Sequence, residues 1–133
     1  MSALHRAAIA ASAILLASAQ LTAHHGTASF DVGKELTLKG IITEWIWANP
    51  HCFLKFDAKD ENGATKSWMV ETQNPTDMTR RGWSRRSFKV GDEVIVKVEP
   101  VKGSAPVGRI LSVVLPSGET LWAIGGPPVP AAQ

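Results

Sequence analysis

The sequence predicts an all-β protein, a small OB-like barrel of five to six strands with one short helix between the third and fourth strands. Three observations lead to this class. Stretches in which apolar and polar residues alternate recur between Gly33 and Ile124, separated by turns that contain glycine or proline. One helix start is evident, and it follows the third of these stretches. The first stretch is long and contains Gly40, which suits a strand that bends sharply. A plain β-sandwich is the alternative topology.

The first 23 residues have the parts of a secretory signal peptide in the right order. A short, positively charged start at residues 1–6 precedes an apolar run at residues 7–16 that is too short to span a bilayer. Small residues then offer two cleavage sites, after Ala19, which the local pattern favours, or after Ala23. We therefore divide the chain into signal peptide 1–23 (alternative end at 19), leader 24–32, β-barrel domain 33–124 and a disordered tail 125–133.

Composition limits the partners of the mature protein. The chain has 133 residues and a net charge of +2, and removal of the signal peptide takes away one arginine and no acidic residue, which leaves about +1. That charge is too small for a nucleic-acid-binding surface. No later segment is apolar enough to span a membrane, and a single cysteine excludes an internal disulfide. We expect one domain, periplasmic or secreted, with a periplasmic protein or a small ligand as its partner.

The first half of the domain predicts three strands. Residues 34–48 form the long first strand, which Asn49-Pro50 ends. Residues 52–58 and 65–71 form a hairpin about a turn at residues 60–63. Alternation assigns the two faces of this hairpin. The inward residues are Cys52, Leu54, Phe56, Trp68 and Val70, and the outward residues are His51, Phe53, Lys55, Asp57, Ser67, Met69 and Glu71.

The second half predicts the helix and the remaining strands. Asn74 is a suitable N-cap, Pro75 suits the first helical position, and Gly82 can end the helix within about two turns. Two or three further strands follow, at residues 93–98, 107–115 and 120–124.

Three histidines remain after the signal peptide is removed, and they are the candidate metal ligands. With the later cleavage site, His24 becomes the first residue and offers both its α-amine and its imidazole, while His25 adds another nitrogen. An amine together with the imidazole of His51 makes a nitrogen set that favours copper, and Glu71 or Met69 can add a weak fourth ligand. The leader must then fold back to His51. The alternative is that His51 only caps the Asn-Pro corner and the leader histidines bind nothing.

A second hypothesis is a binding or accessory module without metal. Residues 80–86 combine four arginines with a tryptophan. This segment predicts an aromatic and basic surface for a small anion or a partner protein, made of Trp45, Arg80, Trp83 and Arg85. At so small a net charge we favour the structural explanation, in which arginine stabilises a helix C-terminus, Gly82 ends the helix and Trp83 plugs the barrel. We expect Trp47 and Trp68 inside the barrel and Trp122, with Trp45, at a surface.

Nothing in the sequence predicts catalysis. Cys52 faces inward, and no cationic neighbour is evident that would activate its thiol. The chain contains no Gly-x-Ser-x-Gly motif, no phosphate-binding loop and no plausible Ser-His-acid set. We therefore expect a protein that is not an enzyme, and a hydrolase has no residue set to support it.

Several motifs together resemble one family of small exported bacterial proteins, domain of unknown function 6152. They are Ala-His-His at residues 23–25, the Trp-x-Asn-Pro-His corner at 47–51, Trp68 with Glu71, Arg-x-Gly-Trp at 80–83 and Gly91-Asp92. The resemblance spans about residues 23–120 and implies a periplasmic location and a small β-barrel, without an established activity. It also favours cleavage after Ala23. Two departures are Gly26, where the family usually has Ser, and Cys52, at a position that is usually a plain apolar residue.

Overall fold

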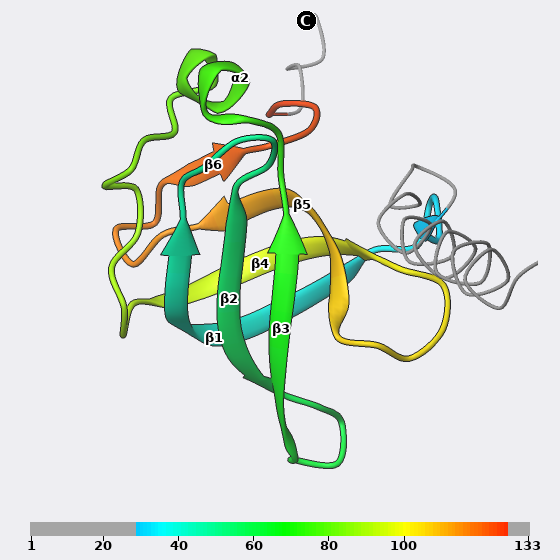
Figure 1. Ribbon diagram of the computed structural model, residues 1–133. Helices are drawn as coiled ribbons and strands as arrows, with labels where there is room; N and C mark the ends of the chain where they lie inside the picture. Colours follow the sequence, from blue (N-terminus) through cyan, green and yellow to red (C-terminus); the bar gives the residue numbers. More distant parts are fainter. Residues whose placement is uncertain (1–28, 128–133) are drawn as a thin grey trace, which may run out of the picture.

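A computed structural model describes residues 29–127 as six strands and one short helix (Figure 1). The elements, in chain order, are β1 (Leu36–Ile46), β2 (Phe53–Lys59), β3 (Thr65–Glu71), α2 (Pro75–Arg80), β4 (Glu93–Pro100), β5 (Val107–Val114) and β6 (Thr120–Trp122). The predicted number of strands and the place of the helix are confirmed. Within the described residues no helix has the length and apolar character needed to cross a membrane.

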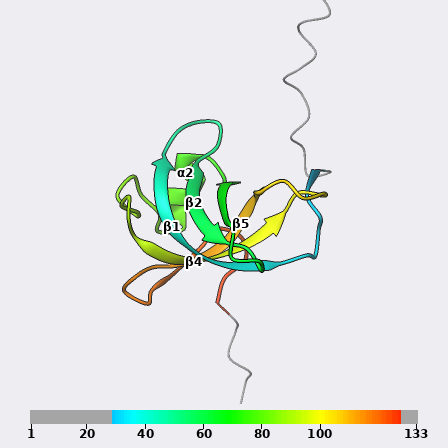
Figure 2. The same cartoon turned by 90° about the horizontal axis from the view of Figure 1, so that it is seen from below.

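The five longer strands close into a barrel. The sheet order is β3-β2-β1-β4-β5-β6, and β3 also pairs with β5 in parallel through Met69–Glu71 and Val107–Arg109. β1 therefore lies between β2 and β4, and the parallel pair closes the ring, while β6 extends it along β5. Figure 2, which looks at the same ribbon from below, shows the strands curling around one interior. One continuous sheet excludes the β-sandwich alternative and confirms the predicted OB-like class.

The bend of β1 depends on Gly40. This residue is buried and pairs with Ala58 of β2 on one side and with Val94 of β4 on the other. A Cβ atom here would lie 2.6 Å from Cδ2 of Phe56 and 2.8 Å from the carbonyl oxygen of Asp57. Only glycine lets the neighbouring strand approach so closely. A register shift between Ile42 and Glu44 then marks a bulge a little further along the strand.

The helix and the chain after it close one end of the barrel. Asn74 caps α2 by accepting a hydrogen bond from the backbone N–H of Asp77 at 3.0 Å. At the other end Gly82 has a φ of 86°, and its N–H donates to the carbonyl of Thr79. The N–H of Trp83 donates to the carbonyl of Met78. This is a Schellman ending, in which an apolar contact between the residues before and after the turn is common. Met78 and Trp83 both belong to the buried core.

One residue of the predicted leader, Phe30, packs against the barrel. Phe30, which the sequence analysis placed in the leader, is only 7% exposed and forms an isolated bridge with Val101 beyond β4. The alternation rule missed this attachment because the segment has no strand partner near it in sequence. The predicted signal peptide and most of the predicted tail lie outside the described residues.

Candidate functional site

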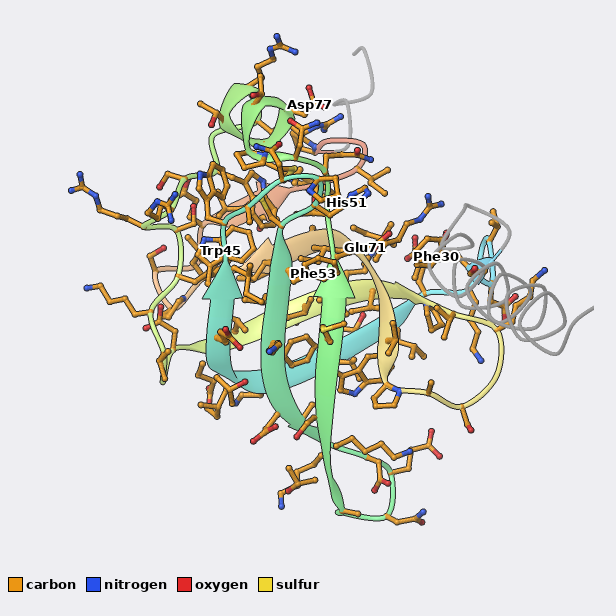
Figure 3. All side chains as sticks on the ribbon, viewed as in Figure 1. Phe30, Trp45, His51, Phe53, Glu71 and Asp77 are labelled. Carbon is orange, nitrogen blue, oxygen red and sulfur yellow. The ribbon has the colours of Figure 1, made fainter. Side chains whose placement is uncertain are left out.

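The outer face of the β2–β3 hairpin carries the residues that can do chemistry. Phe53 and Glu71 are register partners, and His51 precedes Phe53 by two residues. Beyond the two strands the pairing continues through a bulge, because Cys52 donates to the carbonyl of Gln73 and accepts from the N–H of Thr72, so that two residues lie opposite one. His51 is therefore the diagonal neighbour of Glu71 at this end of the hairpin, beside the bulge. Figure 3 shows them near the same end of the two strands.

The predicted faces of the hairpin are confirmed. Every residue assigned to the interior is buried, and the outward residues are half-buried or exposed. Parity along two paired strands was enough to assign these positions, because neighbouring side chains of a strand must point to opposite sides.

His51 makes one hydrogen bond that determines its tautomer. Its Nδ1 atom lies 3.0 Å from the carbonyl oxygen of Thr72. Because a carbonyl oxygen can only accept, Nδ1 is the donor, and the neutral ring keeps its lone pair on Nε2. Among residues 29–127 nothing forms a hydrogen bond with Nε2. The half-buried ring is thus held in one orientation with an acceptor nitrogen available.

Thr72 is itself fixed in place. It is buried, and its hydroxyl lies 3.0 Å from the sulfur of Met78 in α2. The carbonyl that orients His51 therefore belongs to a residue held between the barrel and its helix. Such an arrangement restricts rotation of the imidazole ring.

A small pocket of about 130 Å³ lies beside Glu71. Phe53, Met69 and Glu71 line it from the hairpin, and Val107 and Gly108 line it from β5. Its remaining walls come from Ser29, Phe30 and Val101. The start of the described chain thus shares a pocket with the hairpin, and in Figure 3 Phe30 lies beyond β5 as seen from Glu71.

Of the other predicted metal ligands, Glu71 and Met69 belong to the described residues. His24 and His25 lie outside the described residues. Within the part of the chain that the structure describes, no three His, Cys, Asp or Glu side chains come together as a metal-binding group. The barrel thus offers His51 with Glu71 as its neighbour. Met69 lies two residue pairs further from His51 along β3, opposite Lys55, so that Glu71 is the closer of the two proposed weak ligands.

The predicted aromatic and basic surface needs correction at Trp83. This side chain is 1% exposed, its indole N–H donates to the carbonyl of Trp122 at 3.0 Å, and its ring packs against Phe88. It therefore cannot stack on a ligand from solvent. The favoured structural explanation, in which Trp83 plugs the barrel, is confirmed.

The remaining members of that surface are more accessible. Trp45 is half-buried, donates from its indole N–H to the carbonyl of Ser84 at 3.1 Å, and contacts Trp47 as well as Trp83. Arg80 and Arg85 are exposed, and Arg80 forms an ion pair with Asp77 at 3.2 Å. Trp47 is also half-buried, so its predicted place in the barrel interior is only partly correct.

Cys52 behaves as the sequence analysis expects. It is fully buried, and this burial raises the pKa of its thiol, against a smaller opposing influence of the backbone of Ala48. A thiol with a raised pKa is a poor nucleophile at neutral pH.

Comparison with known proteins identifies one family. The family model described as "Family of unknown function (DUF6152)" matches residues 11–109. No curated protein and no solved structure matches the chain.

Proposed function

The chain belongs to DUF6152, a family of unknown function, and we propose that it is an exported metal-binding protein whose preferred ion is copper. The ligands are His51 on the barrel and the nitrogens of His24 and His25 in the leader, and Glu71 is a further weak ligand. The protein works in the periplasm, or after secretion, and performs no catalysis of its own.

The hydrogen bond of His51 is the observation that carries this proposal. Metal-binding histidines commonly donate their second ring N–H to a carbonyl or a carboxylate, which fixes the tautomer and directs the free lone pair toward the ion. His51 has this arrangement, because Nδ1 donates to Thr72 and Nε2 is left as the acceptor. A purely structural capping role explains the hydrogen bond at Nδ1, but it does not require Nε2 to be an available acceptor.

The path of the chain supports a contribution from the leader. Phe30 and Glu71 line the same pocket, and Glu71 is the diagonal neighbour of His51. His25 precedes Phe30 by five residues, and an extended chain of this length spans at most about 17 Å. The leader histidines are therefore joined by a short tether to a residue that shares a pocket with Glu71.

The choice of copper rests on the ligand types. Imidazole and amine nitrogens bind copper more strongly than other divalent first-row ions, including zinc. Cleavage after Ala23 would place an α-amine next to the imidazole of His24, and cleavage after Ala19 would leave His24 and His25 as imidazole ligands only. The intact mass of the mature protein distinguishes the two forms.

Copper titration tests the proposal. The mature protein, His51→Ala and the control Gln73→Ala are titrated with Cu(II) in competition with a chromophoric chelator, and folding of each is checked by circular dichroism. Gln73 is exposed and lies across the hairpin from Cys52, the residue after His51, so its substitution changes the nearby surface without removing a ligand. We expect His51→Ala to bind copper at least about tenfold more weakly, and Gln73→Ala to match the wild type. Equal affinity of all three proteins would exclude a site that includes His51.

A binding module without metal is the second candidate, and fewer observations favour it. Arg80 and Arg81 line a surface hollow with Gln73 and Asp77, which can hold a small anion. However, Asp77 already neutralises Arg80. This candidate predicts that Arg80→Ala weakens capture of a partner while copper binding stays unchanged.

A further inference from the structure

The carboxylate of Glu71 is half-buried and has no partner within residues 29–127. No ion pair and no hydrogen bond in this part of the chain involves its side-chain oxygens. Lys55, which lies opposite Met69 on the same outer face, pairs instead with Glu44 at 2.6 Å. A carboxylate that loses part of its water shell without gaining a partner is unfavourable, so Glu71 is able to attract a cation from solution.

Arg109 lies next to Glu71 but is already neutralised. The two residues are register partners across β3 and β5. Arg109 donates from Nη2 and Nε to Oε1 of Glu99, at 2.7 and 2.8 Å, and its guanidinium group lies 5.0 Å from the centre of the Phe30 ring. Glu99 is only 6% exposed, so this ion pair is little weakened by salt. The neighbouring cation is therefore committed to Glu99, and the negative charge of Glu71 stays uncompensated.

The pocket beside Glu71 is mostly apolar. Its volume is about 130 Å³, and Ser29 supplies its other polar side chain. The rest of the lining comes from the start of the described chain, the hairpin and the segment that enters β5: Phe30, Phe53, Met69, Val101, Val107 and Gly108. A cavity of about 150 Å³ can hold a benzene molecule, so this pocket has room for about five non-hydrogen atoms. We call it the Glu71 pocket.

We propose that the Glu71 pocket binds a primary alkylammonium ion, with the ammonium group on the carboxylate and the carbon chain against the apolar walls. This goes beyond the proposed copper binding and requires neither a metal nor His51. An anion would be repelled by Glu71, and an uncharged apolar ligand would remove more water from the carboxylate without pairing it. A quaternary ammonium ion has no N–H group to donate to Glu71. A primary ammonium group with its N–H donors, on a slender chain, suits both parts of the pocket.

The probe for this site is n-butylammonium chloride, whose chain and head group match the size of the pocket. So small a ligand makes few contacts, and we expect a Kd of about 1 mM. The mature full-length protein, kept free of metal by a chelator, is titrated at neutral pH and constant ionic strength, and binding is followed by backbone amide NMR shifts. The shifts of Phe53, Glu71 and Val107 should saturate together. n-Butanol, which lacks the charge, and ammonium chloride, which lacks the chain, should each bind at least about tenfold more weakly.

Variants of the pocket test the role of each part. Glu71→Gln removes the charge and keeps the shape of the side chain, and loss of a hydrogen bond to a charged group should weaken n-butylammonium binding at least about tenfold. Glu61→Gln is the matched control, because it makes the same chemical change at an exposed residue in the turn at the other end of the hairpin, and it should bind like the wild type. Met69→Ala shortens one wall of the pocket and should weaken binding about threefold.

Two comparisons complete the test. Nα-Acetyl-lysine N-methylamide presents the same ammonium chain on a peptide, so tighter binding than that of n-butylammonium identifies a lysine side chain of a partner protein as the source, and weaker binding identifies a free amine. His51→Ala should bind n-butylammonium like the wild type whatever its copper affinity, so this inference and the proposed function fail separately. The inference is overturned if n-butylammonium gives no saturable shifts at the pocket, if Glu71→Gln binds it as tightly as the wild type, or if n-butanol binds equally well.

Discussion

Removing the Trp83 side chain tests whether this residue is a structural plug. The indole is 1% exposed in the core, and Trp→Ala at a buried position costs about 3–5 kcal/mol through lost transfer energy and the cavity that remains. The carbonyl of Trp122 also loses its hydrogen bond from the indole N–H, which contributes about 1 kcal/mol. We therefore expect the free energy of unfolding of Trp83→Ala to be about 4–6 kcal/mol lower than that of the wild type.

Urea denaturation followed by circular dichroism measures this change. For a slope of about 2 kcal/mol per molar urea, the midpoint should fall by about 2–3 M, and the melting temperature should fall by about 20 °C or more. Trp83→Phe keeps most of the apolar volume and loses the hydrogen bond, so a loss of about 1–2 kcal/mol is expected. The exposed Arg80→Ala should change stability by less than about 0.5 kcal/mol. If Trp83→Ala lowers the free energy of unfolding by less than about 1 kcal/mol, Trp83 is not a structural plug.

Three more predictions concern the scaffold. Gly40→Ala should lower the free energy of unfolding by about 1–3 kcal/mol, because the new Cβ would meet the carbonyl oxygen of Asp57 at 2.8 Å, whereas Gly126→Ala, with open space around it, should be neutral in the same urea titration. Asn74→Ala should cost about 1 kcal/mol through loss of the helix cap, and Asn74→Ser, which keeps an uncharged capping oxygen, should restore most of it. Burial raises the pKa of the Cys52 thiol, so the folded state favours the neutral form. The contribution of this thiol to stability is complete below the unfolded pKa of about 8.5 and decreases as pH rises above it. Alkylation followed by mass spectrometry should find the thiol protected at pH 8 in the native protein and reactive in urea, and rapid native alkylation would contradict its burial.

Local patterns in the sequence determined a large part of the barrel. The faces of β2 and β3, the cap at Asn74 and the helix end at Gly82 all follow from interactions between residues a few positions apart. Period-two alternation and capping are local rules, so a single sequence is enough to apply them. The outward position of His51 and Glu71 was predicted in this way.

The tertiary structure alone decided which distant groups meet. The Nδ1 atom of His51 forms a hydrogen bond with the carbonyl of Thr72, and the indole N–H of Trp83 donates to the carbonyl of Trp122. The opposite charges of Glu99 and Arg109, which are register partners on two consecutive strands, were a signal present in the sequence, but Phe30 carries no local sign of its contact with Arg109. Such contacts depend on strand register across the closed barrel, which is set by the packing of the whole core and not by any short segment.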